Sequence, residues 1–255
     1  MSELKIVLAL SSYPSAKYVA SRLSKSKNVV GIIFEKTRTP REVLIRMFKR
    51  AKKRGVIRLL DEVLFRVFDW ATRKGKKSIL NSDISNTESI PKIFVKSVND
   101  SESIKFTKDL KADILLVYGT GILKKEIINV PVQGVLNIHP GITPEYRGLE
   151  PTFWAMAKQD FDKIGVTIHY IDEGIDTGRI LSQETVKIEK NDSYHTLFEK
   201  SLEKGVDLLL HVISDIENGK IKTTDKAGSV SKVYSRPGIS NYFAYRRALK
   251  SFKKN

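Results

Sequence analysis

KIVLAL at residues 5–10 and VVGIIF at residues 29–34 are short apolar runs that are typical of buried strands. Residues 14–23 between them predict a helix that begins at Pro14. A strand, a helix and a second strand in this order form a βαβ unit, and such units imply a parallel sheet. We therefore expect an α/β fold in which a mostly parallel, twisted sheet carries helices on both faces.

The same alternation continues along the chain. Further strands are predicted at residues 93–95, 113–118, 134–138, 165–171 and 180–188, and further helices at 101–110, 123–128 and 193–218. We expect residues 1–220 to form one catalytic domain and residues 221–255 a C-terminal extension.

One segment, at about residues 39–77, interrupts the alternation. Thr39-Pro40-Arg41-Glu42 is a strong helix start, and apolar residues recur at helical spacing on both sides of Gly55, so a basic helical hairpin is expected here. Thirteen Lys or Arg against four acidic residues give residues 40–77 a net charge of +9, more than half of the chain's +16. The apolar stripe of this hairpin must be covered by the sheet domain, by a second subunit in a homodimer, or by a membrane surface in a peripheral contact.

Composition excludes several classes of site among the 255 residues. The sequence contains no cysteine, so disulfides, thiolate nucleophiles and iron–sulfur clusters are excluded, and no metal site is expected. We find neither a signal peptide nor a membrane-spanning stretch, which favours a cytoplasmic location. The first strand is followed by Ser11-Ser12-Tyr13-Pro14 and not by a glycine-rich phosphate loop, which argues against NAD(P) and ATP chemistry.

Polar side chains follow the later strands, where ligands of such sheets bind. Asn137 and His139 are two residues apart at a strand end, so both side chains point to the same side and can converge on one oxygen. Asp176, in the loop after the 165–171 strand, could orient the imidazole as a proton donor. An amide donor, an imidazole and a carboxylate form an oxyanion site without a covalent nucleophile, which suits direct acyl transfer to an external amine.

Three segments, NIHPGITPEYRG at 137–148, GVTIHY at 165–170 and DEGIDTG at 172–178, closely resemble the folate-dependent formyltransferases. This resemblance implies a Rossmann-like fold, 10-formyltetrahydrofolate as formyl donor and tetrahydrofolate as product. The family's catalytic Asn, His and Asp fall on Asn137, His139 and Asp176. Its pterin pocket falls on Tyr118, Thr120, Gly121, Ile122, Leu123, Ile171, Asp172, Glu173 and Gly174. We expect the acceptor to contact Ser11, Ser12, Gly141, Arg147 and Gly148, whereas His169, His195 and His211 are interpreted as structural or surface residues.

The acceptor is narrowed by departures from the family's patterns. The tRNA-directed members carry a C-terminal barrel, the glycinamide ribonucleotide members a glycine-rich loop after the first strand, and the cofactor deformylases an N-terminal regulatory domain. None of these is found, so the chain most resembles the amino-sugar N-formyltransferases, and the expected acceptor is an anionic, nucleotide-linked amine. Methionyl-tRNA and glycinamide ribonucleotide remain alternative acceptors, although tRNA is disfavoured despite the basic charge. A non-catalytic, ligand-binding role is a further alternative. We expect no DNA partner.

Overall fold

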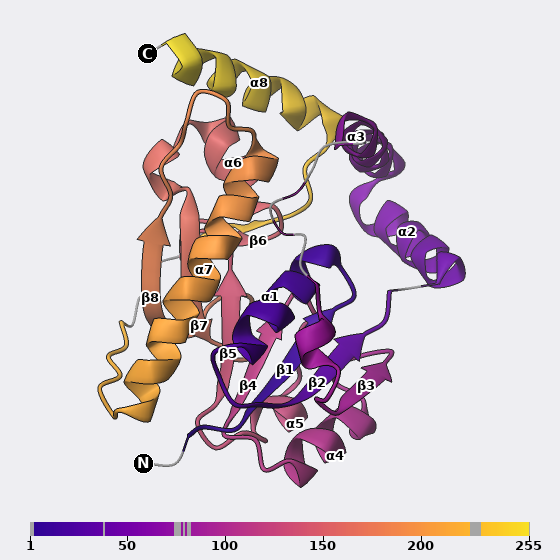
Figure 1. Cartoon of the computed structure of the whole chain (residues 1–255). Coiled ribbons are helices and arrows are strands. Elements are labelled where there is room, and N and C mark those ends of the chain that lie inside the picture. Colours follow the sequence, from indigo (N-terminus) through magenta and orange to yellow (C-terminus); the bar gives the residue numbers. More distant parts are fainter. Residues whose placement is uncertain are drawn as a thin grey trace.

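The structure is a computed structural model that describes residues 3–37, 39–73, 78, 80, 83–224 and 231–254. Its centre is a seven-stranded sheet in the order β3-β2-β1-β4-β5-β7-β8 (Figure 1). The first five strands in this order are parallel, whereas β7 is antiparallel to both of its neighbours. The strands are β1 Ile6–Ser11, β2 Val29–Glu35, β3 Lys92–Val95, β4 Ile114–Tyr118, β5 Val135–His139, β7 Gly165–Tyr170 and β8 Ile180–Thr185.

Helices cover both faces of the sheet, as predicted. α1 (Pro14–Ser24) and α7 (Tyr194–Glu217) share one apolar core with alternate residues of β1, β4 and β5, and Figure 1 shows them on the near face. α4 (Ser101–Asp109) and α5 (Lys125–Ile128) share the other core with the remaining residues of β1 and β4. The strands are apolar on both sides because each face is buried.

The predicted insertion consists of α2 (Pro40–Arg54) and α3 (Val56–Arg73). Thr39 and Glu42 form the expected capping box, and Gly55, with φ at +87°, separates the two helices. The helices meet at this turn without lying along each other as in a packed hairpin: in Figure 1, α3 is seen nearly end-on while α2 runs across the view. Residues 74–77 of the predicted segment lie outside the described residues.

The C-terminal extension folds back onto the domain. A short strand β9 (Val233–Tyr234) pairs with β6 (Arg147–Gly148), and α8 (Ile239–Lys254) packs beside α3 and α6 (Pro151–Lys158), as Figure 1 shows at the top of the molecule. These elements share a third, largely aromatic core that includes Phe65, Phe153 and Tyr245. Residues 225–230 of the extension lie outside the described residues.

Sequence patterns did not predict β6, α6, β9 or α8, nor the short helices η1 (Ser85–Thr87) and η2 (Phe161–Lys163). β6 and β9 have two residues each, which is too short for an alternation to be recognised. α6 begins after Glu150, whose backbone is left-handed, so the usual polar N-cap signal is missing. No helix in the described residues is long and apolar enough to cross a membrane.

Candidate active site

The β5–β7 strand pair presents a row of polar side chains on the face opposite α7. Leu136 and Ile138 of β5 point into the core beneath α7, so Asn137 and His139, which alternate with them, point to the other side. In the antiparallel register Asn137 lies opposite His169, and His139 lies opposite Thr167. The pairing of β5 with β7 therefore brings two histidines and an amide together on one face.

Asn137 and His169 are joined by a hydrogen bond. The Nδ1 atom of His169 lies 2.7 Å from the carbonyl oxygen of Tyr170, which can only accept, so Nδ1 carries the ring proton. Nε2 is then an acceptor, and the amide nitrogen of Asn137 donates to it at 3.1 Å. Burial lowers the pKa of His169, and the neighbouring His139 lowers it further, which keeps this imidazole neutral. One N–H of the Asn137 amide is thus held by His169, and the second remains for a ligand.

His139 is buried at the end of β5, and both of its ring nitrogens face oxygen atoms. Nε2 donates to the carbonyl oxygen of Tyr146 at 2.7 Å. Nδ1 lies 3.6 Å from a carboxylate oxygen of Asp176. A proton on Nδ1 would therefore lie between the imidazole and this carboxylate.

The carboxylate of Asp176 lies close to both His139 and His169. Its Oδ2 atom faces His139, and its Oδ1 atom lies 3.7 Å from Nε2 of His169. The backbone of Asp176 is left-handed, with φ at +50°. The main-chain N–H of Gly148 donates to Oδ2 at 2.8 Å and fixes the carboxylate from the other side.

The loop that carries Asp176 does not follow the expected route. If β7 ran parallel to β5, the loop after β7 would leave the sheet at the edge where β5 ends, as expected from the sequence. Because β7 is antiparallel to β5, the loop instead leaves where β5 begins, and the N–H of Ile171 donates to the carbonyl oxygen of Val135 at 2.8 Å. The loop then runs the length of β5 before Asp176 reaches His139.

This arrangement supplies an amide donor, an imidazole and a carboxylate within one buried group of side chains. The neighbouring hydroxyl of Thr167 is not available as a nucleophile, since it donates to the carbonyl oxygen of Gly141 at 2.7 Å and accepts from the N–H of Thr143. Such a group can stabilise negative charge on an oxygen and move a proton without forming a covalent intermediate.

Comparison with known proteins assigns the chain. A family model described as "Formyl transferase" matches residues 27–213, which contain Asn137, His139, His169 and Asp176. The chain belongs to the formyl transferase family. Outside this match lie β1 and α1 at the start of the chain and β9 and α8 near its end.

Several relatives of this family are similar in sequence over part of their length. A methionyl-tRNA formyltransferase from Wolbachia sp. subsp. Drosophila simulans is 44% identical over 118 residues, which are 46% of this chain and 39% of that protein. A methionyl-tRNA formyltransferase from Kosmotoga olearia is 35% identical over 154 residues, or 59% of this chain and 49% of that protein. The chain thus spans less than half the length of these relatives.

Solved structures of formyltransferases share the fold over nearly the whole chain. A phosphoribosylglycinamide formyltransferase from Anaplasma phagocytophilum superimposes with a TM-score of 0.61 at 19% identity, over 92% of this chain and 100% of that one. A 4-N formyltransferase from Francisella tularensis gives 0.56 at 18% identity, over 97% of this chain and 88% of that one. At these identities the likeness shows the fold.

The two segments predicted to hold the donor lie next to each other in this formyl transferase domain. Leu123 and Ile171 belong to one apolar core, and Lys125 forms an ion pair with Glu173 at 3.6 Å. Because Tyr118 and Leu123 are buried, they can offer a ligand only their main chain. The same burial raises the pKa of the Tyr118 hydroxyl. Ile122, by contrast, exposes 69% of its surface.

Several polar groups of these two segments already have partners within the protein. The N–H of Gly121 donates to the carboxylate of Glu35 at 2.9 Å. The hydroxyl of Thr120 lies 3.2 Å from the carbonyl oxygen of Gly121. Asp172 caps its own turn, since its carboxylate accepts from the N–H of Gly174 and from the hydroxyl of Thr177.

The residues predicted to contact the acceptor occupy two places. Ser11 and Ser12 lie at the carboxyl end of β1, where the buried hydroxyl of Ser11 has no hydrogen-bond partner among the described residues. Gly141 and Gly148 lie beside His139 and Asp176. Arg147 is turned to the C-terminal extension, since its guanidinium donates to the carbonyl oxygen of Ser231 at 2.7 Å.

Among the other histidines, His169 makes contacts in the candidate site that sequence reasoning did not predict. It is interpreted from the sequence as structural or on the surface; the structure buries it, and it contacts Asn137 and faces Asp176. The available signal was the alternation in GVTIHY, where Thr167 and His169 put polar groups on one side of an apolar strand. His195 pairs with Asp69 at 2.7 Å and His211 is exposed on α7, as interpreted.

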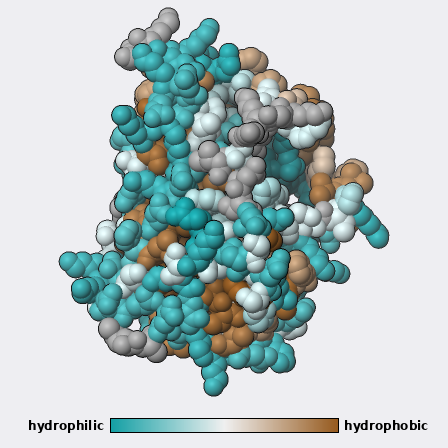
Figure 2. All heavy atoms as spheres, viewed as in Figure 1, coloured by the Kyte–Doolittle hydropathy of each residue, from teal (hydrophilic) through white to brown (hydrophobic). Residues whose placement is uncertain are grey.

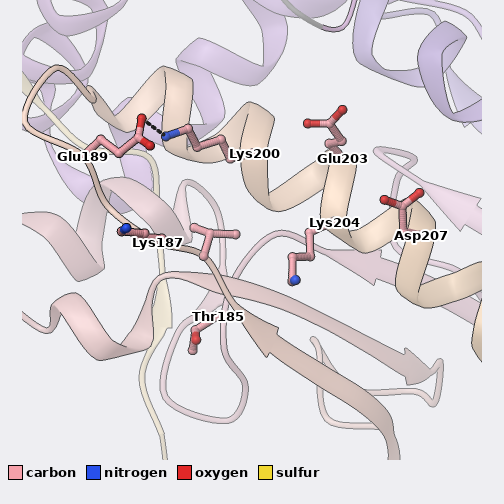
Figure 3. A pocket seen from close by; sticks show the side chains of 8 residues that line it. Thr185, Lys187, Glu189, Lys200, Glu203, Lys204 and Asp207 are labelled. Carbon is pink, nitrogen blue, oxygen red and sulfur yellow. Dashed lines mark hydrogen bonds and ion pairs between the residues drawn. The ribbon is translucent and has the colours of Figure 1, made fainter.

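A shallow hollow of about 350 Å³ lies elsewhere, between the end of β8 and α7 (Figure 3). Two of its three lysines are already paired with carboxylates: Lys200 contacts Glu189 at 3.0 Å, and Lys204 contacts Glu184 at 2.6 Å. None of the predicted site residues lines it, so it is not the candidate active site.

Proposed function

We propose that this protein transfers a formyl group from 10-formyltetrahydrofolate to a primary amine. The observation that carries the proposal is the contact group formed by Asn137, His139, His169 and Asp176. The proposed catalytic unit is the predicted domain of residues 1–220 together with residues 231–254, because β9 pairs with β6 beside Asp176.

Each proposed catalytic side chain has a distinct role. When bound, 10-formyltetrahydrofolate supplies a formyl carbonyl whose carbon the amine attacks. The free N–H of Asn137, held in place by His169, donates to the carbonyl oxygen as negative charge develops there. The carboxylate of Asp176 accepts the proton that the amine loses and passes it to Nδ1 of His139, 3.6 Å away, from which it reaches the departing nitrogen.

The two adjoining segments fit a flat heterocyclic donor. Residues 118–123 and 171–176 combine main-chain donors and acceptors with apolar side chains, and Ile122 and Ile175 are exposed there. Sites of this composition suit a ring with several polar edges. The donor would therefore be held mostly by main-chain groups, beside Asp176.

The acceptor that we propose is an amino sugar linked to a nucleotide. A sugar N-formyltransferase from Shewanella sp. FDAARGOS_354 shares the fold over 96% of this chain, which supports this choice. A second support is a basic group near Ser11 and Ser12. Burial lowers the pKa of Arg66 of α3, and the neighbouring Arg236 lowers it further, whereas Tyr13 raises it. Arg66 thus interacts with Arg236 and with Tyr13, which follows β1 by two residues, and the two guanidinium groups would attract a phosphate-bearing acceptor.

Methionyl-tRNA is the second candidate acceptor. The segment that is 44% identical to the Wolbachia methionyl-tRNA formyltransferase favours it. An aminoacyl-tRNA would also meet the chain's net charge of +16 with its phosphates. Both candidates present a primary amine to the same side chains, so the proposed chemistry does not depend on which one is correct.

The test is a formylation assay with the purified protein and 10-formyltetrahydrofolate. Nucleotide-linked amino sugars and methionyl-tRNA are supplied separately, and the formylated product is identified by mass spectrometry. Formyl product from a nucleotide sugar supports the first acceptor, and formylmethionyl-tRNA alone supports the second. A reaction that consumes the donor equally with and without amine would contradict transfer, because it would indicate hydrolysis.

A further inference from the structure

The orientation of α3 is unusual for a helix packed on a protein. Its inward face carries Phe65 with polar residues: Asp61 accepts from the N–H and hydroxyl of Ser240, and Asp69 binds the hydroxyl of Tyr194. Its outward face is apolar, and the six side chains there are between 55 and 86% exposed. They are Val56, Ile57, Leu60, Leu64, Val67 and Trp70.

The neighbouring helix α2 is amphipathic and has no buried side chain among its described residues. One side of it carries Val43, Leu44 and Phe48, and Phe48 is 64% exposed. Figure 2 shows hydrophobic (brown) side chains gathered at the right of the molecule, where α2 lies in Figure 1, with hydrophilic (teal) side chains beside them. Basic side chains occupy most of the rest of the circumference of α2, with Arg41 beside Phe48 and Arg50 beside Val43. They are Arg41, Arg46, Lys49, Arg50, Lys52 and Lys53.

Acidic groups do not offset this charge. The two helices carry ten Lys or Arg against four acidic residues. Glu42 caps its own helix, Glu62 pairs with Arg58, and Asp61 and Asp69 are bound to the body of the protein. The surface that α2 and α3 turn outward is therefore apolar and strongly basic.

From this surface we infer that α2 and α3 form a peripheral anchor that lies on anionic phospholipid membranes. In such a contact the apolar side chains enter the boundary between headgroups and acyl chains, and the Lys and Arg side chains pair with lipid phosphates. Two short helices without a spanning segment are suited to lying in the interface rather than crossing it. The inference concerns the outward side chains of α2 and α3, which are not among the proposed catalytic or acceptor-binding residues, and it does not depend on the proposed reaction.

Charge and apolar surface together favour a membrane over a second copy of the chain and over an RNA. A second copy of the chain, related by a twofold axis, would place the same basic helices against each other, and like charges at close range repel. An RNA would match the basic residues but would leave Phe48, Ile57 and Leu60 with no apolar partner. An anionic membrane satisfies both the charge and the apolar side chains.

The inference is tested with the full chain and lipid vesicles. Flotation with phosphatidylcholine vesicles is compared with flotation on vesicles that contain one quarter phosphatidylglycerol, at low and at high salt. We expect binding to the anionic vesicles only, weakened at high salt because the charges are screened. The fluorescence of the exposed Trp70 should shift to shorter wavelength on binding, and Trp70→Phe should remove this shift.

Variants with matched controls separate this surface from general charge and apolarity. Lys49→Glu with Lys53→Glu should reduce vesicle partitioning by about thirtyfold or more, since each basic residue near an anionic surface contributes about a factor of five. Lys108→Glu with Lys222→Glu makes the same charge change elsewhere and should reduce it far less. Ile57→Ser with Leu60→Ser should abolish partitioning, whereas Val132→Ser, at another exposed apolar position, should not. Circular dichroism verifies that each variant is folded.

Three outcomes would overturn the inference. The first is no binding of the folded wild-type protein to anionic vesicles at low salt. The second is a stable dimer in sedimentation that Ile57→Ser with Leu60→Ser dissociates, since a second copy would then cover the surface. The third is equal loss of binding in the Lys108→Glu with Lys222→Glu control, which would mean attraction by net charge alone.

Discussion

The carboxylate of Asp176 accepts a hydrogen bond from the main-chain N–H of Gly148, 2.8 Å away. Gly148 belongs to β6, which pairs with β9 of the C-terminal extension. The position of a proposed catalytic carboxylate therefore depends on a strand some sixty residues further along the chain, through a single peptide group.

Replacing Gly148 should disturb Asp176. Its backbone has φ at +94°, and a Cβ atom would lie 2.4 Å from the carbonyl oxygen of Tyr234. We expect Gly148→Ala to lower kcat by roughly tenfold to a hundredfold, because small displacements of a catalytic group have effects of this size. Gly219→Ala is the matched control: φ is also positive, but nothing lies within 4 Å, so about 1 kcal/mol of stability should be lost without loss of activity. Steady-state kinetics and thermal unfolding measure both.

Asn137→Ala should lower kcat by ~10²–10³, the usual effect of removing a donor to a developing oxyanion. His139→Ala should lower kcat by ~10²–10⁴, the usual contribution of a positioned acid–base group. Binding of a folate analogue, followed by calorimetry, should remain because the predicted donor pocket uses other residues. His211→Ala, at an exposed position on α7, should leave turnover unchanged. Wild-type turnover by His139→Ala with the true acceptor would refute the assignment.

His169 should make stability depend on pH. Its pKa is lowered in the folded state by burial, whereas an unfolded histidine titrates near 6.5. As pH falls below 6.5, the unfolded chain binds a proton that the folded protein does not, so the free energy of unfolding decreases, by at most about 1.4 kcal/mol per pH unit. Urea unfolding at pH 7.5 and 5.5 should show a smaller difference for His169→Gln than for wild type. An unchanged difference would show that His169 is not kept neutral by the fold.

Two substitutions on α3 test which face is inward. Phe65 is 4% exposed among the aromatic residues of the third core, so Phe65→Ala should destabilise the protein by about 3–5 kcal/mol. Ile57 is 86% exposed on the same helix, so Ile57→Ala should change stability by no more than about 0.5 kcal/mol. Chemical denaturation compares the two. Equal effects would mean that α3 packs differently in solution.

Arg66 and Arg236 test the anionic acceptor. We expect Arg66→Ala or Arg236→Ala to raise the KM for a nucleotide-linked amino sugar by roughly tenfold to a hundredfold, because hydrogen bonds to charged groups contribute about 1.5–3 kcal/mol. kcat should change little, since neither side chain contacts the proposed catalytic group. Arg41→Ala, at the exposed start of α2, is the control. An unchanged KM in both variants would remove the support that these residues give to a phosphate-bearing acceptor.

Sequence patterns predicted the order and type of the central elements well, because their apolar runs are continuous and buried on both faces. β4 and β5, for example, lie within a residue or two of the predicted ranges. Such patterns do not predict strand direction, because the apolar residues of β7 alternate in the same way whether β7 runs parallel or antiparallel to β5. α8 escaped prediction because its apolar residues contact α3 and α6, which are distant in sequence.

Sequence patterns indicated several residues of the candidate site but not the contacts between them. Asn137 and His139 could be paired from their spacing, since side chains two apart on a strand share a face. His169 and Gly148 could not, because their roles come from cross-strand register and from β9. Contacts that depend on pairing between distant segments leave no periodic signal in the sequence.

The docking of α8 beside α3 has a consequence for synthesis on the ribosome. Phe65 emerges about 170 residues before Tyr234 and still earlier than Tyr245, its partners in the third core, a delay of roughly ten seconds to half a minute. Until then the side of α3 that packs on α8 stays uncovered, and β6, once made, has no strand to pair with. The third core is therefore completed only after α8 is made. Before that, the nascent chain exposes apolar surface that chaperones can bind.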